Sequence, residues 1–306
     1  MNLTSVIYEE GASAIVHRLD RFSIGYQSGS NVIKLGRQAI SWGNGVMFRP
    51  MDFLNPFDPS AIDKEYKTGD DMVYAQHLFA NGNDLQLVWG GRRNTDGKLN
   101  NEHASLAGKL HAFVGASEID VLIGKHYNDT VIAIGGVFNA GEGLVRADVV
   151  LVDTTENTYV SAVANYNYSW TAFDLNMSAV IEYIHKDFGV SNGEYTAKTF
   201  TENPELGARL VRGELYSLGQ DYLGVSLLTE LSPLWLAGSN LFYNINDYSS
   251  LVQVVSRHDL SQNSRASIAL SLPIGAYGSE YGGISISDDP PTTTEWSLYA
   301  QWAWYF

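Results

Sequence analysis

The chain has 306 residues, no cysteine and a net charge of −15 at pH 7, from 34 acidic and 19 basic residues. The lack of cysteine excludes disulfide frameworks, zinc–cysteine sites and iron–sulfur clusters. The acidic excess argues against a nucleic-acid partner, because few cations remain to neutralise phosphates. With 45% hydrophobic residues, the composition is that of a folded protein.

The sequence excludes a transmembrane helix, because no stretch of 18 or more apolar residues occurs. The first twenty residues lack a basic start followed by an apolar run, so no signal peptide is visible and we expect a mature or N-terminally truncated chain. Two classes remain: a soluble β-protein and a closed membrane barrel.

Period-two alternation predicts fifteen strands, with a further stub at residues 2–9. In residues 175–183, for example, Met177 and Ile181 lie on one side and Glu182 on the other. Segments of about ten residues with one apolar side are typical of membrane barrels, although a half-buried soluble sheet has the same period. The predicted strands cover residues 14–27, 31–42, 72–81, 84–92, 105–114, 118–126, 130–138, 143–153, 158–171, 174–186, 208–231, 232–245, 250–260, 264–275 and 295–306.

The connections between these strands alternate in length. Every second connection is tight and rich in Gly, Asn, Ser or Pro, as hairpin turns require. The four long connections, 43–71, 93–104, 187–207 and 276–294, all fall on the other side. Outer-membrane barrels sort short periplasmic turns and longer external loops in this way, whereas a soluble sandwich has no reason to. The pattern predicts an all-β fold over residues 1–306: a single up-and-down antiparallel transmembrane barrel of about sixteen strands.

The longest connection, 43–71, contains Pro50, Pro56 and Pro59, which favour a fixed loop. A loop of about thirty residues without secondary structure is uncommon in a compact fold and usually has a function. It either folds into the lumen and narrows it, or lies outside in water; both positions stay open. Within a constriction, its excess of acidic over basic residues predicts a mild preference for cations. The candidate pore residues are Arg37, Arg49, Asp52, Asp58, Asp63, Lys64, Glu65, Lys67, Asp70 and Asp71.

Charged residues within the predicted strands are candidates for the inner wall. Arg37 is the best of these, because an arginine that faces lipid at mid-depth is costly. The other candidates are Arg146 with Asp148, Glu182 with Lys186, and Glu230. We expect such residues to pair across strands and stiffen the wall.

The last predicted strand, 296–306, has apolar side chains at alternate positions and ends in Phe306. As the exposed edge of a soluble sandwich it would be prone to aggregation. It resembles the C-terminal strand of Gram-negative outer-membrane β-barrels, and the GRQ…WG…NPF run in residues 36–57 resembles a stretch of porin-like outer-membrane proteins. The resemblance implies location in the bacterial outer membrane and recognition of Trp302, Trp304 and Phe306 by the barrel-assembly machinery. It also implies contact with outer-membrane lipids and lipopolysaccharide, and it leaves a homotrimer open.

Enzyme signatures are absent from the sequence: there is no G-x-S-x-G elbow, no H-E-x-x-H and no P-loop. The seven histidines have no ligand spacing, and His185 or His258 beside a wall serine is a remote esterase alternative. We therefore expect no catalytic residues, no metal and no cofactor. The predicted function is an outer-membrane porin for passive diffusion of small hydrophilic solutes or ions. The alternatives are a non-conducting barrel acting as a binding or export scaffold, and an outer-membrane esterase.

Overall fold

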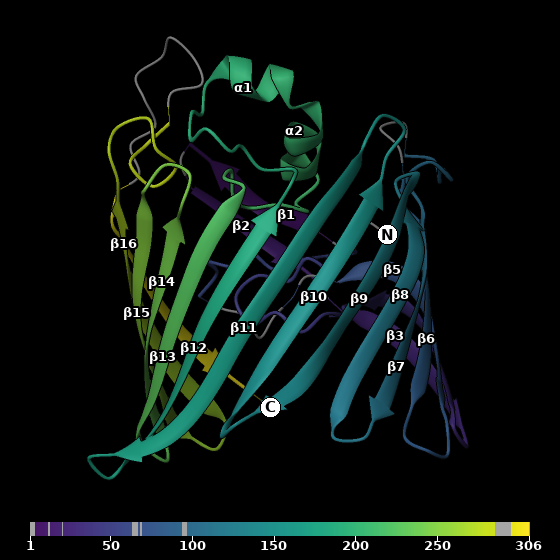
Figure 1. Ribbon diagram of the computed structural model, residues 1–306, viewed down its shortest axis with the longest axis horizontal. Coiled ribbons are helices and arrows are strands. Elements are labelled where there is room, and N and C mark those ends of the chain that lie inside the picture. The colour runs from purple at the N-terminus through teal and green to yellow at the C-terminus, as the bar shows by residue number, and fades with distance from the viewer. Residues whose placement is uncertain are drawn as a thin grey trace.

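The computed structural model describes residues 4–305, apart from 12, 20, 63–66, 68, 94–96 and 285–294, and apart from the side chains of Thr4 and Arg18. Within these residues the fold is all-β, with two short helices in one connection (Figure 1). The elements are β1 (Thr4–Glu10), β2 (Ser13–Arg18), β3 (Phe22–Ser28), β4 (Asn31–Gln38), β5 (Asp70–Leu78), β6 (Asp84–Gly90), β7 (Ser105–Val114), β8 (Ser117–His126), β9 (Asp129–Ala140), β10 (Gly143–Asp153), β11 (Thr158–Ala172), β12 (Leu175–Lys186), α1 (Ala197–Glu202), α2 (Pro204–Val211), β13 (Asp221–Ser232), β14 (Trp235–Asn244), β15 (Ser250–Ser261), β16 (Ser264–Ile274) and β17 (Ser297–Trp304).

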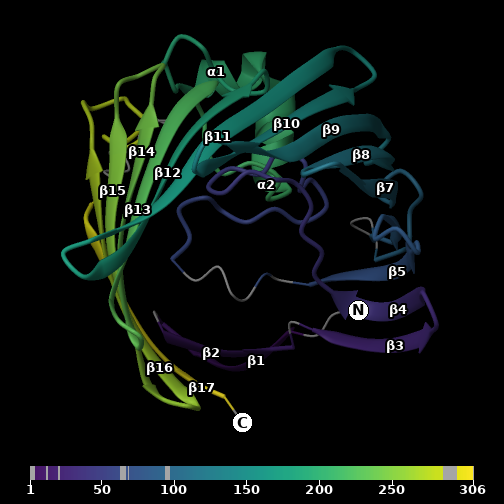
Figure 2. The same ribbon diagram turned by 60° about the horizontal axis from the view of Figure 1, so that its bottom comes forward.

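Strands β3 to β17 form one antiparallel sheet of fifteen strands, in which each strand pairs with its neighbours in sequence. The sheet curves into a barrel-like ring (Figure 2). Its edge strands, β3 and β17, are not paired with each other, so the sheet is not closed. Strands β1 and β2 form a separate hairpin that lies across the gap between those edges in Figure 2. The all-β, up-and-down antiparallel order predicted from the sequence is confirmed.

Two predicted strands differ most from the structure, and the strand expected over 31–42 ends at Gln38. The strand expected over 14–27 divides into β2 and β3, because three charged residues fall within positions 18–21 and interrupt the alternation. The strand expected over 208–231 begins only at Asp221, since residues 204–211 form α2. The sequence at Pro204 favours this helix, because proline at the first helical position is pre-organised for it.

The two faces of the sheet differ in polarity. On β9, Ile132 and Ile134 point outward and are exposed, whereas Val131 and Ala133 between them point inward and are buried. The predicted alternation is confirmed here and along β11, β12 and β16. Large apolar side chains cover the outer face, while the inner face includes buried polar and charged groups such as Glu182. The outer face is therefore mainly apolar, and the inner face is mixed, with buried apolar residues beside the polar and charged ones.

The two ends of the ring differ in their connections (Figure 1). At one end the turns are short; Phe173 and Asp174 join β11 to β12 with φ of 54° and 60°, the backbone of a type I′ hairpin turn. At the other end lie the long connections, including both helices. The predicted sorting of connections by length is therefore confirmed.

Candidate functional site

The connection between β4 and β5, residues 39–69, lies inside the ring of strands, as Figure 2 shows for its described residues. It contacts β10 and β12 near its start. Farther along, the carbonyl oxygen of Ser60 accepts a hydrogen bond of 2.7 Å from Nε2 of Gln253 on β15. One connection thus touches inner-face side chains of strands that are far apart in the sheet. We call it the interior segment.

A buried carboxylate on β12 anchors the start of the interior segment. The side chain of Glu182 points inward and is 0% exposed. Its oxygens accept the backbone N–H groups of three successive residues, Val46, Met47 and Phe48, at 2.6–2.9 Å. The Asn165 amide donates a fourth bond of 3.0 Å. Hydrogen bonds to an ionised acceptor are stronger than neutral ones, so this side chain holds the segment's backbone against the wall.

A second inward carboxylate, Asp148 on β10, holds the preceding residues. It accepts the backbone N–H of Asn44 at 2.6 Å and that of Gly45 at 3.3 Å, and the Asn44 side-chain amide at 2.7 Å. Gly43 has a φ of 95°, a conformation that favours glycine. A Cβ on Gly45 would lie 1.8 Å from the carbonyl oxygen of Phe48. The Gly-Asn-Gly sequence therefore permits the close approach of the backbone to Asp148.

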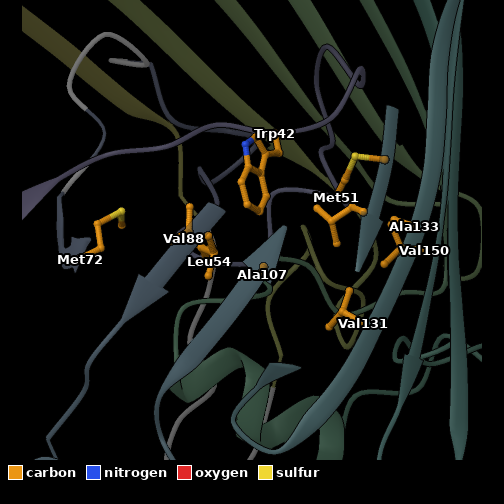
Figure 3. Close-up of a cluster of buried hydrophobic side chains, with 10 residues drawn as sticks. Trp42, Met51, Leu54, Met72, Val88, Ala107, Val131, Ala133 and Val150 are labelled. Carbon is orange, nitrogen blue, oxygen red and sulfur yellow. The ribbon is translucent and has the colours of Figure 1, made fainter. Parts of the chain in front are cut away.

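Apolar side chains of the interior segment pack on the inner wall (Figure 3). Trp42, Met51 and Leu54 join a buried cluster with inward residues of β5–β10, and Met47 and Phe48 join a second cluster with those of β11–β14. The wall residues are Met72, Val88, Ala107, Leu122, Val131, Ala133 and Val150 in the first cluster, and Val163, Ile184, Tyr222 and Phe242 in the second. The segment is thus held by apolar burial as well as by two carboxylates.

A buried ion pair joins the two arms of the interior segment. The Lys67 ammonium lies 2.7 Å from the Asp52 carboxylate, and both side chains are almost fully buried. The same ammonium donates to the carbonyl oxygen of Ile40 and to Ser41 Oγ. Burial raises the pKa of Asp52 to about 6 although Lys67 opposes the shift, and burial lowers the pKa of Lys67. Loss of either partner would leave an uncompensated buried charge.

Arg37 lies at the end of β4 and forms an ion pair of 3.0 Å with Asp71. In the strand register, Arg37 lies opposite Phe22 on β3 and Asp71 on β5. By alternation it shares the face of exposed Leu35 and not the face of buried Gln38. This differs from the inward orientation expected from the sequence. Asp71 neutralises the guanidinium at the strand end, so the cost that led to that expectation does not arise there.

The other candidate pore residues are spread over local contacts. Asp70 pairs with Arg92 at 2.5 Å, and Arg49 donates from Nε to the Gly45 carbonyl oxygen at 3.0 Å. Asp58 accepts the backbone N–H and hydroxyl of Ser60. The structure therefore does not gather the charges into one ring. Asp63, Lys64 and Glu65 lie outside the described residues.

The expected assembly signal lies on β17. Trp302 and Trp304 point outward, 72% and 61% exposed. Phe306 lies outside the described residues. The two indole rings form part of the apolar outer face.

The helical connection between β12 and β13 is tied to the β8–β9 end by ion pairs that the sequence analysis missed. Arg209 of α2 lies 2.7 Å from Asp129, and Glu214 contacts His126 at 3.0 Å and Arg212 at 2.8 Å. Burial opposes ionisation of Glu214, but the hydrogen bond to His126 and the nearby arginines outweigh it and lower the pKa of this carboxyl. The helix-start sequence at residues 203–205 is the signal that could have located this connection.

A series of hydrogen bonds links Ser105, His126 and Glu214. Ser105 Oγ lies 2.7 Å from His126 Nδ1, and His126 Nε2 lies 3.0 Å from the Glu214 carboxylate. The order of groups is that of a serine hydrolase. Ser105, however, is 1% exposed, and Arg92 also donates to its hydroxyl. An ester carbonyl has no access to the Ser105 oxygen, so we interpret these hydrogen bonds as a structural link between β7, β8 and the helical connection.

No family model, curated protein or solved structure matches this chain. Neither helix in the described residues is long and apolar enough to cross a membrane. Among the same residues, no group of three or more His, Asp or Glu side chains is arranged to hold a metal ion.

Proposed function

We propose that this chain is a bacterial outer-membrane β-barrel through which small hydrophilic solutes or ions diffuse passively, and that the interior segment narrows the passage. The observation that carries the proposal is a sheet with an apolar outer face, together with a connection anchored to its inner face by Glu182 and Asp148. An apolar exterior suits lipid tails, and a ring this wide has room for water beside a constricting loop.

The apolar outer face of the sheet supports the membrane part of this proposal. A soluble protein rarely exposes a continuous apolar surface of this size. Contact with outer-membrane lipids and lipopolysaccharide, recognition by the assembly machinery and a homotrimer remain predictions. So does the mild cation preference, which a reversal potential measured in a salt gradient would test.

Planar-bilayer recording tests the channel. Purified full-length protein should give stable open steps, and deletion of residues 53–62 should enlarge them, since the deletion keeps the anchored residues 46–48 and the Asp52–Lys67 ion pair. Deletion of Thr155 and Glu156, which are exposed in the connection between β10 and β11, is the control and should leave the step size unchanged. Silence of the unaltered protein would contradict the channel, and unchanged steps after the first deletion would contradict the constriction.

A non-conducting scaffold is the second candidate, and one observation favours it. Two apolar clusters fix the interior segment to β5–β14, which would suit a plug as well as a constriction. Bilayer silence combined with intact folding would support this alternative. An esterase would need labelling of the folded protein by a serine-directed probe, and the burial of Ser105 argues against it.

A further inference from the structure

A cavity of about 100 Å³ lies between the interior segment and the helical connection. Residues 48–59 form one side, Arg209 and residues 214–217 form another, and inward side chains of β8–β12 close it. Tyr216 lines the cavity, is 44% exposed, and donates a long hydrogen bond of 3.4 Å to the Pro56 carbonyl oxygen. The cavity therefore reaches the surface beside this ring.

Five aromatic side chains contribute to the walls of the cavity, beside other apolar and several charged residues. The rings of Phe48, Phe53, Phe57, Phe188 and Tyr216 line it, together with prolines of the interior segment. By volume the cavity holds a molecule of roughly ten non-hydrogen atoms or fewer, since one water needs about 10–15 Å³.

One buried cation in the wall is not neutralised by contact. Lys186 lines the cavity and is 3% exposed. Its ammonium donates to the carbonyl oxygen and hydroxyl of Ser217 and lies 4.8 Å from the Tyr222 ring. Within the described residues no carboxylate oxygen lies within 4 Å of it; Asp221 and Glu280 attract it from farther away. A buried charge without a close counter-ion is costly.

The carboxylates that line the cavity are committed to other cations. Asp52 pairs with Lys67, Asp129 with Arg209, and Glu214 with Arg209 and Arg212. Repulsion of an incoming anion is therefore reduced by these pairs. The charged side chains that line the cavity therefore do not share the acidic excess of the whole chain.

We propose that this cavity binds a small aromatic monocarboxylate, with its ring between the aromatic walls and its carboxylate paired with Lys186. An apolar body matches the aromatic side chains of the wall, and a single negative group matches an ammonium that has no carboxylate in direct contact. A role of this site in selecting the diffusing solute rests on the proposed channel function, whereas the binding itself does not.

Calorimetric titration of the full-length protein in detergent with benzoate tests the proposal. Benzyl alcohol, which has the same ring and no charge, is the control ligand. The variant Lys186→Gln removes the cation, and Lys198→Gln removes the same charge from an exposed side chain of α1. Lys186→Arg keeps a cation at the site.

The unaltered protein should bind benzoate at least tenfold more tightly than benzyl alcohol. Lys186→Gln should lose that preference, while Lys198→Gln should keep it and Lys186→Arg should retain most of it. Absence of benzoate binding to the unaltered protein, or equal affinity for the two ligands, would overturn the proposal even if Lys186→Gln does not fold. Failure of binding in a protein that still conducts would reject this site and leave the channel standing.

Discussion

Replacing Glu182 by glutamine removes the charge that holds residues 46–48 while keeping the size of the side chain. One amide oxygen accepts at most two of the three backbone N–H groups, and the amide nitrogen is a further donor facing them. A buried N–H without a partner costs about 1–3 kcal/mol, and each remaining bond loses roughly 1 kcal/mol of charge assistance. We expect the attachment to weaken by about 3 kcal/mol, a shift of roughly a hundredfold in the equilibrium between attached and detached segments.

Single-channel recording and trypsin cleavage after Lys67 measure this change. Lys67 is almost fully buried in the anchored segment, so cleavage reports detachment. Glu182→Gln should show frequent transitions to a larger conductance and faster cleavage. The matched control is Glu230→Gln, which removes the same charge from β13, where the carboxylate accepts a hydrogen bond of 3.1 Å from the exposed side chain of Asn176. If the two variants behave alike in both assays, Glu182 is not the anchor.

Three further predictions concern folding. Gly45→Ala should lower stability by about 3 kcal/mol in thermal melts, because the added Cβ has no room, whereas Gly207→Ala, where a Cβ meets no atom within 4 Å, should not; equal melts would contradict this. The pKa of Glu214 is lower in the folded protein than its unfolded value of about 4.5, so its ionised carboxylate stabilises the fold above that value. This stabilisation is lost as the pH falls through the folded pKa. The melting temperature of Glu214→Gln should therefore fall less on acidification than that of the unaltered protein. Ile268→Lys, on the outer face near the middle of β16, should impair folding into lipid vesicles at a cost of about 2–4 kcal/mol, whereas Gln301→Lys on the inner face of the neighbouring β17 should fold; the reverse order would refute the assigned faces.

Local pattern was sufficient to predict the strands and the sorting of their connections. Alternation specifies which side chains share a face, so the outward position of Ile181 and the inward position of Glu182 followed from spacing alone. The boundary errors arose where another signal competed: the charged residues at 18–21 and the helix start at Pro204.

The partners of the inward charges could not be predicted, because they come from distant parts of the chain. Glu182 and Lys186 were expected to face inward and to pair with charges on neighbouring strands. Instead Glu182 binds backbone N–H groups more than 130 residues away, and Lys186 binds Ser217. Spacing indicates that a carboxylate faces inward, but not which segment arrives to meet it.

Quenching of tryptophan fluorescence by brominated lipids tests the central claim most directly. In vesicles, a variant that keeps only Trp302 should be strongly quenched, because this ring lies on the exposed outer face. A variant that keeps only Trp42 should not be, because this side chain is buried inside and its Nε1 donates to Gln86 at 2.7 Å. Equal quenching of the two, or a protein that stays dissolved without detergent and shows no quenching, would contradict a ring of strands with lipid outside and the anchored segment within.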